Sequence, residues 1–335
     1  MAVFLTSKDI ETILTMDDYI KQVEEAYRAW GNGSATMLTR SKIDTKRRTG
    51  FLKILPGALE EKNMAGIHAY TGGGRGEFLK AVFLFAIDTG ELVAVVEADR
   101  IGWLTPGAAS AVATRYLAVK GADTLSLFGS GRQARAQVWA LSRVLNLSLV
   151  KVFSPNKEHR ETFCAEMEKK LSVKFLPVSN PREAIEGAQV ISTATNTKEP
   201  LFPGELVEAG THINAIGAHD PKRREIDGTC MKKSKVVVDH LQRALGEEGA
   251  IILAEGEGLF HREQVYGELG EIVAGKKKGR DNAAEITVFL SGAVAIEYIA
   301  VAAEAYIRAK ENGLGQKLDL TKDYGVPKSL YIKER

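Results

Sequence analysis

One stretch constrains the fold more than any other. An apolar strand pattern at 125–128 runs directly into Gly-Ser-Gly-Arg-Gln-Ala at 129–134, and a helical pattern follows. In this order, G-x-G-x-x-A is typical of a dinucleotide-binding turn: Gly129 permits the tight turn, Gly131 lets backbone N–H groups approach a pyrophosphate, and Ala134 leaves room for helix-on-strand packing. The helical spacing continues through Ala134, Val138, Leu141 and Leu145. A glycine-rich turn that binds nothing is the alternative, and the combined pattern favours the dinucleotide site.

Length and composition exclude several classes of protein. The 335 residues are long for one compact core and favour two domains. With 45 basic and 43 acidic side chains, the net charge of +2 provides no single-signed field for nucleic acid. Cys164 and Cys230 form no C-x-x-C motif, and the apolar stretch 286–307 is interrupted by Glu297 and Glu304, which are costly in lipid. We therefore expect a cytoplasmic protein with no metal site, no nucleic-acid partner and no membrane span.

The first third of the chain differs in pattern from the middle. Two helices near the start are expected to be capped by Ser7 and Asp17. Short apolar runs then predict an antiparallel or mixed sheet, with strands at 51–55, 65–70, 82–87 and 92–96. Residues 88–91 predict a hairpin between the last two strands. A further helix is expected to begin at Thr105, with Pro106 in its first turn, and to end at Lys120.

From residue 124 onward, strand and helix patterns alternate. The expected strands are 124–128, 149–153, 174–178, 189–192, 212–215 and 235–238. This alternation predicts an α/β fold with a Rossmann-type, doubly wound parallel sheet. We place the Rossmann domain at 116–307 and a discontinuous α+β dimerisation and substrate domain at 1–115 with 308–335. A long helix at 286–311 is expected to bridge the two, and a cleft between them is the natural substrate site.

The end of the second Rossmann strand bears on which dinucleotide binds. In NAD-binding versions, an acid at this point accepts hydrogen bonds from the ribose hydroxyls. Here the strand ends in Ser154-Pro155-Asn156-Lys157, followed by Glu158 and Arg160. Ser154 and Asn156 can donate to a 2′-phosphate that Lys157 and Arg160 neutralise, or the same residues can merely cap the next helix and lie in solvent. The pattern favours NADP(H), with NAD(H) as the alternative.

Several motifs, in order and spacing, resemble the ornithine cyclodeaminase/mu-crystallin family. They are the turn at 129–134, Thr-Ala-Thr at 193–195, Gly-Ala-His-Asp-Pro at 217–221, Arg-Glu-Ile-Asp at 224–227 and Gly-Glu-Leu-Gly-Glu-Ile-Val-Ala-Gly at 267–275. The resemblance implies a homodimer formed through the terminal domain, a nicotinamide cofactor, a small-molecule substrate and chemistry at a C–N bond. The expected dinucleotide-binding residues are Gly129, Ser130, Gly131, Arg132, Gln133, Ser154, Asn156, Lys157, Arg160, Thr193, Ala194, Thr195, Gly217, Ala218 and Ser291.

The resemblance also implies a set of three cationic residues that bind the substrate carboxylate. This sequence differs from the family at two of the three positions. Family members use an Arg before the first sheet, a Lys within it and an Arg just before a helix start. Arg40 fits the first role, but His68 and Thr105 stand at the other two positions. Neither replaces the charge of the lost cation or a bidentate Arg–carboxylate pair, so we expect a less anionic carbonyl or imine substrate. The expected substrate-binding residues are Arg40, Lys53, His68 and Thr105.

The loop at 217–221 holds the expected acid and base. Asp220 matches the family's Gly-Ala-Asp-x-Pro acid with a one-residue offset, because His219 occupies the literal third position. A loop after a Rossmann strand lies at the sheet edge where ligands bind, so Asp220, His219 and His68 are the expected catalytic residues. Alternatively, Asp220 only forms a turn and His219 packs against the cofactor.

The resulting functional hypothesis is an NAD(P)-dependent oxidoreductase of the imine or ketimine reductase or amino-acid dehydrogenase type. In such an enzyme the cofactor carries the hydride chemistry and the protein supplies orientation. Two alternatives remain open: a cyclodeaminase-type ammonia lyase that uses bound NAD, and an NADP-dependent binding protein without turnover.

Overall fold

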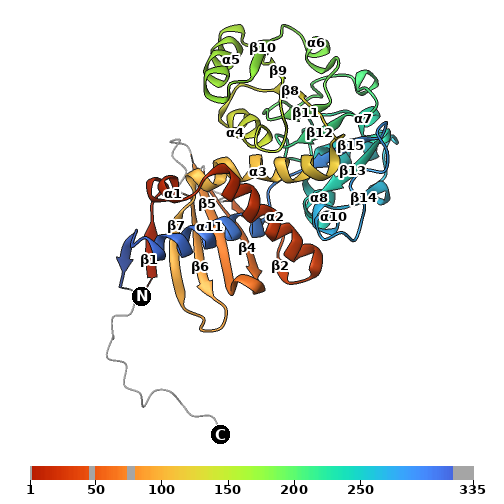
Figure 1. Ribbon diagram of the computed structural model, residues 1–335. Coiled ribbons are helices and arrows are strands. Elements are labelled where there is room, and N and C mark those ends of the chain that lie inside the picture. The colour runs from red at the N-terminus through yellow and green to blue at the C-terminus, as the bar shows by residue number, and fades with distance from the viewer. Residues whose placement is uncertain (1, 45–49, 74–79, 320–335) are drawn as a thin grey trace, which may run out of the picture.

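The computed structural model describes residues 2–44, 50–73 and 80–319, which form two eight-stranded sheets with helix α3 (Asp99–Leu117) lying between them (Figure 1). The first sheet has the order β16-β1-β7-β6-β5-β4-β2, with β3 beside β4. Its strands are β1 (Ala2–Leu5), β2 (Ala35–Met37), β3 (Ser41–Asp44), β4 (Gly50–Leu59), β5 (Met64–Gly73), β6 (Lys80–Ala86), β7 (Leu92–Glu97) and β16 (Gln316–Leu318). Helices α1 (Ser7–Ile13), α2 (Met16–Asn32) and α11 (Ala295–Glu311) belong to this domain. The sheet is mixed, as predicted, because β1 and β7 are parallel and the other pairs antiparallel.

The second sheet is parallel throughout and has the order β10-β9-β8-β11-β12-β15-β13-β14. Its strands are β8 (Thr124–Phe128), β9 (Leu149–Phe153), β10 (Lys174–Pro177), β11 (Val190–Thr193), β12 (His212–Ala215), β13 (Ser234–Val238), β14 (Val265–Glu268) and β15 (Ile286–Leu290). Its helices are α4 (Arg132–Leu141), α5 (Lys157–Leu171), α6 (Pro181–Ile185), α7 (Gly228–Lys232), α8 (Leu241–Glu247), α9 (Gly249–Gly256) and α10 (Leu269–Val273). Strands β8 to β12 lie in the order third, second, first, fourth, fifth, which is the dinucleotide-binding arrangement. The predicted Rossmann-type α/β class is confirmed.

The expected bridging helix at 286–311 is wrong in its first part. Residues Ile286–Leu290 form strand β15, which lies between β12 and β13 and is buried along its whole length. A strand covered on both faces carries a continuous apolar run, which periodicity cannot distinguish from a buried helix. The helix itself, α11, begins at Ala295 and is capped at Asn312.

The expected helix start at Thr105 is also wrong. Helix α3 begins at Asp99, and Pro106 lies inside it. A proline has no N–H to donate, so the carbonyl four residues earlier, that of Gly102, loses its partner within the helix. The side-chain amide of Gln133 in α4 donates to that carbonyl at 3.3 Å and compensates for the loss. The N-caps of α1 and α2 are likewise shifted by one and two residues, to Thr6 and Thr15.

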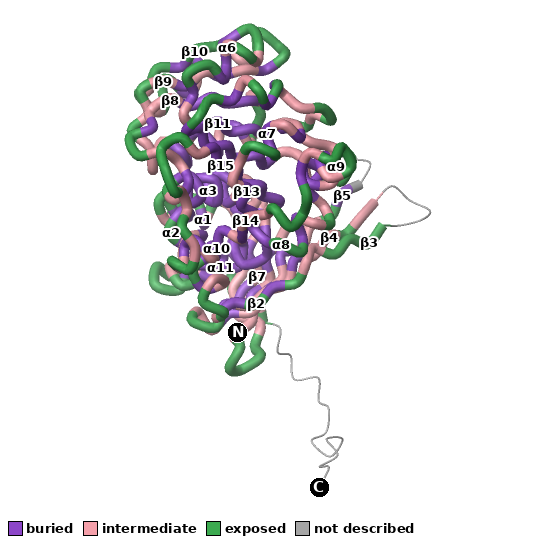
Figure 2. The backbone as a smooth tube through the Cα atoms, turned by 90° about the vertical axis from the view of Figure 1, so that its right-hand side faces the viewer, coloured by how far each residue is buried: buried purple, intermediate pink, exposed green. Residues whose placement is uncertain are grey.

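Helix α3 connects the two domains through close packing of small residues. A Cβ atom at Gly107 would lie 2.6 Å from the carbonyl oxygen of Ala136, so only glycine lets α3 approach α4 this closely. Ala108 and Ala109 beside it are fully buried. Figure 2 shows buried residues running through α3 and through β11, β13 and β15 at the centre of the molecule. Helix α3 thus holds the first domain next to one edge of the parallel sheet.

Both ends of the described chain contribute to the first sheet. Strand β16 pairs antiparallel with β1, with Ala2 opposite Leu318, and α11 packs on β4 and β5. Residues 320–335 of the proposed domain lie outside the described residues. Within the described ranges, no helix combines the length and apolar character needed to cross a membrane.

Candidate active site

The glycine-rich turn after β8 has the geometry of an anion-binding site. Gly129 has a φ of +114°, and a Cβ there would lie 2.6 Å from the carbonyl oxygen of Ala194. Gly131 is the N-cap of α4, and no described heavy atom lies within 4 Å of where its Cβ would be. The first glycine is therefore required by conformation and contact, whereas the second leaves space above a helix N-terminus whose N–H groups favour an anion.

A cavity of about 160 Å³ lies beside this turn, at the carboxyl edge of the parallel sheet. It is lined by loops that follow three neighbouring strands and by one residue each from α3 and α4. The lining residues are Ala194 and Thr195 after β11, Ile216, Gly217 and His219 after β12, Ser291 and Ala293 after β15, Pro106 and Gln133. Six of the expected residues, Gln133, Ala194, Thr195, Gly217, His219 and Ser291, thus meet at one place. This edge is where open α/β sheets bind ligands.

A buried carboxylate that the sequence reasoning gave no role holds two of these loops. Glu225 accepts hydrogen bonds at 2.7 Å from the hydroxyl of Thr193, the backbone N–H and hydroxyl of Thr195, and the backbone N–H of Gly217. It is 2% exposed. Because each bond is made to a charged acceptor, the carboxylate fixes the loops after β11 and β12 relative to each other. The Arg-Glu-Ile-Asp motif marked the position of Glu225, but the motif alone does not reveal these partners.

A second buried charge cluster lies behind His219. The Nδ1 atom of His219 is 3.8 Å from Glu248 Oε1, beyond hydrogen-bonding distance. Glu248 pairs with Arg243 at 2.7 Å, and Arg243 pairs with Asp239 at 2.6 Å. Burial is the largest influence on the pKa of Glu248 and raises it, but the charge and hydrogen bond of Arg243 and the neighbouring His219 together outweigh burial and leave the pKa below its usual range. The carboxylate of Asp239 also accepts from the backbone N–H of Gly292 at 2.7 Å, which ties this cluster to the cavity loop after β15.

That loop is strained where it lines the cavity. Ala293 has a φ of +64°, a left-handed conformation uncommon for a residue with a side chain. The Asp239 contact and a 3.4 Å bond from the backbone N–H of Ala293 to the hydroxyl of Ser291 hold it there. Strain of this kind is typical of functional sites.

The structure separates the two expected proton-transfer residues. His219 lines the cavity, and its Nδ1 is buried without a hydrogen-bond partner among the described residues. Asp220, by contrast, is exposed, and its carboxylate accepts from the backbone N–H of Lys222 at 2.9 Å. Ala218 lies between Gly217 and His219 and is half-buried. The loop therefore presents His219 to the cavity and turns Asp220 toward solvent.

The residues expected to bind the 2′-phosphate of NADP(H) lie at the start of α5. Asn156 caps α5 by accepting from the backbone N–H of His159 at 3.0 Å. Arg160 donates to the carbonyl of Ser154 at 3.0 Å, and the hydroxyl of Ser130 donates to that of Ser154 at the same distance. The ammonium of Lys157 lies in solvent, 3.8 Å from Glu161. The hydroxyls of Ser130 and Ser154 and the guanidinium of Arg160 therefore lie together beside the turn, while Lys157 extends into solvent.

One expected cofactor residue has its side chain directed elsewhere. The guanidinium of Arg132 pairs with Asp99 and lies 5.0 Å from the ring centre of Trp103, so it contacts α3. Its backbone remains part of the turn at the start of α4.

The expected substrate residues lie on the first domain and on α3. Arg40 pairs with Glu247 and donates to the carbonyl of Gly292 at 3.4 Å, which places it beside the loop after β15. The ammonium of Lys53 lies over the ring of Tyr70 at 5.8 Å, and burial, followed by the nearby charge of Arg40, lowers the pKa of Lys53. Two cations thus approach the edge of the site from the first domain, and one is already balanced by a carboxylate.

The remaining two substrate residues are buried and uncharged. The ring of His68 stacks against Tyr298 with 4.0 Å between ring centres, and both of its nitrogens lack a hydrogen-bond partner among the described residues. Burial lowers the pKa of His68 to about 3, so the ring is neutral near pH 7. Thr105 is fully buried beside Pro106, and its hydroxyl likewise has no described partner. Neither residue supplies the positive charge that a carboxylate grip needs.

The groups beside the cavity fit a nicotinamide dinucleotide. Gln133 Oε1 is a buried acceptor without a partner among the described residues, while the amide nitrogen of the same side chain donates to the carbonyl of Gly102. It lines the cavity beside an open helix N-terminus. Among the residues that the structure describes, no cluster of three or more His, Cys, Asp or Glu side chains could hold a metal ion.

Fold and site together define a Rossmann-type dinucleotide-binding protein with its ligand cavity at the carboxyl edge of the sheet. The chain belongs to the ornithine cyclodeaminase/mu-crystallin family, whose family model matches residues 1–313. The resemblance drawn from the motifs is confirmed.

Similar proteins act on carbon–nitrogen bonds. Alanine dehydrogenase of Archaeoglobus fulgidus is 33% identical over 319 residues, which cover 94% of this chain and 97% of that enzyme. The structure of Thermococcus litoralis Δ1-pyrroline-2-carboxylate reductase with NADH and L-proline has a TM-score of 0.89 at 35% identity, covering 94% of this chain and 100% of that one. An archaeal alanine dehydrogenase dimer with bound NAD has a TM-score of 0.89 at 31% identity, covering 96% and 99%. The predicted class, an NAD(P)-dependent oxidoreductase of C–N bonds, is confirmed.

Proposed function

We propose that this protein uses NADP(H) to interconvert a small imine and the corresponding amine at the cavity beside the glycine-rich turn. The observation that carries the proposal is the meeting of Thr195, Gly217, His219 and Ser291 around one cavity at the carboxyl edge of the sheet. A bound dinucleotide supplies or accepts the hydride at this point.

The chain's own residues would hold the dinucleotide along the sheet edge. The turn at Gly129 and Gly131 and the N-terminus of α4 would bind the pyrophosphate. The partnerless oxygen of Gln133 would accept from the carboxamide of the nicotinamide. Ser154, Asn156, Lys157 and Arg160 would bind the phosphorylated ribose, which the absence of an acid at the end of β9 supports. Thr195 and Gly217 would contact the dinucleotide from the cavity wall, and Glu225 fixes their loops and the side chain of Thr193.

His219 is the residue we assign to proton transfer. When an imine is reduced, its carbon receives a hydride and its nitrogen a proton, so a proton donor must face the cavity. His219 lines the cavity, whereas Asp220 and His68 do not appear among its described lining residues. The carboxylate of Glu248 lies 3.8 Å from Nδ1, on the protein side of the ring.

The substrate we infer carries less negative charge than an α-imino acid. Arg40 is already paired with Glu247, and His68 and Thr105 provide no charge. Lys53 is the remaining cation of the expected set, and its pKa is lowered. Losing two charge-assisted hydrogen bonds of about 1.5 to 3 kcal/mol each would weaken transition-state binding of a carboxylate substrate by roughly a hundredfold or more.

A paired assay tests this function. We would follow NADPH consumption with Δ1-pyrroline and with Δ1-pyrroline-2-carboxylate, and the reverse reaction with alanine and ornithine, in the wild type and in a His68→Lys, Thr105→Arg double variant. We expect the wild type to reduce the uncharged imine and to use alanine and ornithine poorly, and the double variant to gain activity with the carboxylate substrates. Efficient wild-type turnover of alanine or ornithine would overturn the substrate assignment. Ammonia release from ornithine without net NADPH consumption would instead indicate the lyase, and cofactor binding without any turnover the binding protein.

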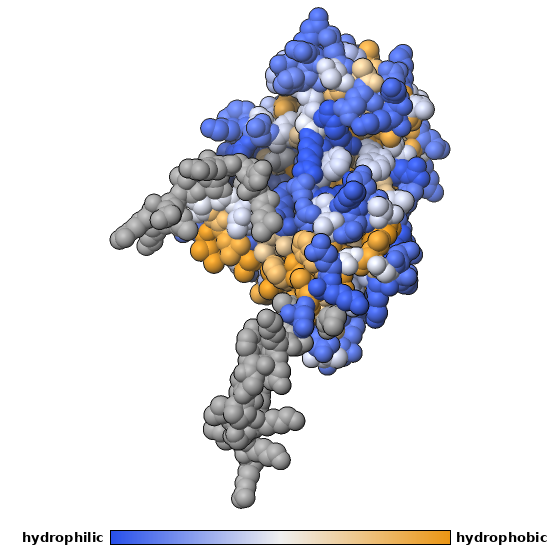
Figure 3. Space-filling view, turned by 90° about the vertical axis from the view of Figure 1, so that its left-hand side faces the viewer, coloured by the Kyte–Doolittle hydropathy of each residue, from blue (hydrophilic) through white to orange (hydrophobic). Residues whose placement is uncertain are grey.

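We also propose a homodimer in which a second copy covers the outer face of the first sheet. On β6 and β7, Val82 and Val96 are buried while Phe83 and Val95 on the opposite face stay partly exposed. Figure 3 shows hydrophobic side chains gathered over the first domain on one side of the molecule. Apolar faces of this kind are usually covered by a partner. Sedimentation should show a dimer at micromolar concentration, which Phe83→Lys dissociates and Leu176→Lys, on the Rossmann domain, does not.

A further inference from the structure

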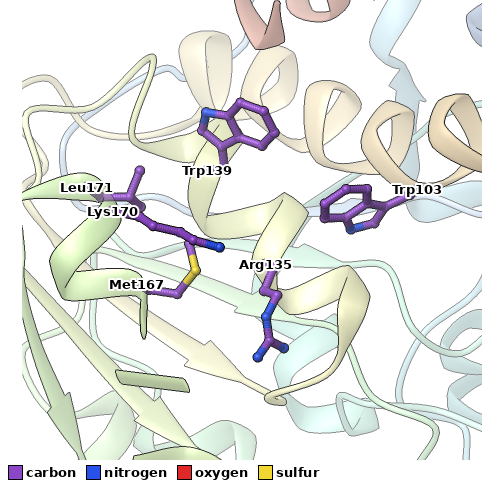
Figure 4. A pocket seen from close by; sticks show the side chains of 6 residues that line it. All are labelled: Trp103, Arg135, Trp139, Met167, Lys170 and Leu171. Carbon is purple, nitrogen blue, oxygen red and sulfur yellow. The ribbon is translucent and has the colours of Figure 1, made fainter. Parts of the chain in front are cut away.

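A second cavity, of about 350 Å³, lies on the outer side of α4 and has no described lining residue in common with the proposed active site. It is lined by Trp103 of α3, by Arg135 and Trp139 of α4, and by Met167, Lys170 and Leu171 of α5. Figure 4 shows these six side chains, from three helices, arranged around one space. Its volume lies at the lower end of the range of small-molecule sites.

The walls favour a flat apolar ligand. Two indole rings, a thioether and an aliphatic side chain form most of the lining. Aromatic ligands gain from such walls both by burial and by stacking or edge contacts with the indoles. Arg135 does not require a polar partner from a ligand. Its Nε and Nη2 already donate to Glu166, and its Nη1 donates to the carbonyls of Ser130 and Gly131.

The ammonium group of Lys170 favours a ligand that carries a negative charge. The ammonium of Lys170 is bonded to Glu166 at 2.8 Å, and its side chain is 61% exposed. Figure 4 shows its nitrogen directed into the space between the walls. Arg135 and Lys170 share the single carboxylate of Glu166, so the three groups together carry one excess positive charge. A ligand with one negative group at its rim would balance that charge.

Two wall residues also hold the backbone of the dinucleotide turn. The indole N–H of Trp103 donates to the carbonyl of Arg132 at 2.7 Å. The guanidinium of Arg135 donates to the carbonyl of Ser130 at 2.8 Å and to that of Gly131 at 3.2 Å. A ligand that shifts either side chain therefore shifts the turn, and the effect on the two affinities must be reciprocal.

We propose that this cavity binds a small, flat aromatic molecule carrying one negative charge, and that its occupancy is coupled to dinucleotide binding at the adjacent turn. The coupling rests on the proposed cofactor site, whereas binding of the aromatic anion does not.

Calorimetric titration with 2-naphthoate, with uncharged 2-naphthamide as the charge control, tests the binding. We expect Trp139→Ala to weaken naphthoate about tenfold. Lys170→Gln should weaken naphthoate about threefold and leave naphthamide unchanged. Leu171→Glu, at a half-exposed position, serves as a second blocking variant should Trp139→Ala fail to fold, and Leu176→Ala, an exposed apolar residue elsewhere, is the matched control. Naphthoate binding that is absent, or that none of these cavity variants changes, overturns the site.

The coupling has its own readout. Saturating naphthoate should change the Kd for NADPH about threefold or more, and saturating NADPH should change the Kd for naphthoate by the same factor. Trp103→Phe keeps an aromatic wall but removes the donor to Arg132, so it should retain naphthoate binding and reduce the coupling. Full competition between the two ligands would place naphthoate in the dinucleotide site and overturn the proposal. Equal NADPH affinity with and without naphthoate would refute the coupling alone, and loss of NADPH binding in every variant would count against the cofactor site instead.

Discussion

The dinucleotide half and the substrate half of the proposed active site differ in the groups that form them. The dinucleotide half consists of backbone loops: glycines shape the turn after β8, and Glu225 fixes the loops after β11 and β12. The substrate half consists of separate side chains from β4, β5, α3 and the segment before β3, among them a neutral His68 and a paired Arg40. A site made of backbone keeps its ligand while surrounding side chains vary, whereas a site made of side chains changes its ligand with one or two substitutions. Under the proposed assignments, this difference accounts for a chain that keeps the glycine-rich turn while His68 and Thr105 supply no charge for a carboxylate.

His219 stands where the halves meet, and its replacement should have the largest effect. His219→Asn should lower the turnover number about a thousandfold by removing the proton donor, with the Kd for NADPH within about threefold of wild type. Asp220→Asn, one residue away but turned to solvent, is the matched control and should retain most activity. Stopped-flow measurement of turnover and separate cofactor titrations would distinguish the two. If instead Asp220→Asn were inactive and His219→Asn active, Asp220 would be the proton donor.

Glu225 tests whether the dinucleotide half depends on its fixed loops. Glu225→Gln should weaken dinucleotide binding about a hundredfold, since bonds to a charged acceptor are worth about 1.5 to 3 kcal/mol each and more than one is lost. Glu257→Gln removes a more exposed carboxylate, paired with Arg224, and should leave binding unchanged. Fluorescence titration of NADPH measures both. Wild-type affinity in Glu225→Gln would show that the loops hold their positions without it.

His68 gives the substrate half a signature in the pH dependence of stability. The buried ring stays neutral down to about pH 3 in the folded protein but takes up a proton near pH 6.5 when unfolded. The unfolded state therefore binds more protons than the folded state between these two pH values. As the pH is lowered from 6.5 to 5, this residue reduces the free energy of unfolding by about 1.5 kcal/mol. Urea unfolding of His68→Leu should show a shallower fall over that interval. His212, whose pKa burial also lowers to about 3, remains in both proteins, so parallel curves would mean that His68 is charged when folded.

The cofactor preference is the smallest of the expected effects. Arg160→Ala should reduce the preference for NADPH over NADH about tenfold by removing one charge-assisted bond to the 2′-phosphate. Arg182→Ala changes an exposed arginine at the start of α6 and is the control. Competitive titration of both dinucleotides provides the ratio. A wild-type preference for NADH would sink the assignment to NADP(H) and make Glu158 the candidate for the ribose hydroxyls.

Local patterns were enough to predict much of the fold. Strands β8, β9 and β12 lie where the sequence placed them, because short apolar runs bounded by turns leave few alternatives. The hairpin at 88–91 joins β6 and β7, as expected. Strand β14 was missed, and β15 was taken for helix because its burial on both faces removes any alternation.

The features that could not be predicted depend on interactions between residues far apart in the sequence. Pro106 favours a helix start by every local rule, and only the amide of Gln133, far along the chain, makes it acceptable inside α3. The four hydrogen bonds to Glu225 likewise come from loops that adjoin only after folding. The glycines and loop positions of the cofactor half could be predicted because their spacing is local. The orientation of His219 toward the cavity and of Asp220 away from it could not.

The pairing of β16 with β1 also fixes an order of events during synthesis. The strands of the first sheet from β1 to β7 are made first, but α11, which packs on β4 and β5, follows only after residues 124–290 have been added. At about 5 to 20 residues per second, that interval lasts on the order of ten seconds. During it the apolar side chains that α11 will cover have no α11 to cover them, and at its end the Rossmann segment has all its strands. The first-made domain is therefore the last to be completed.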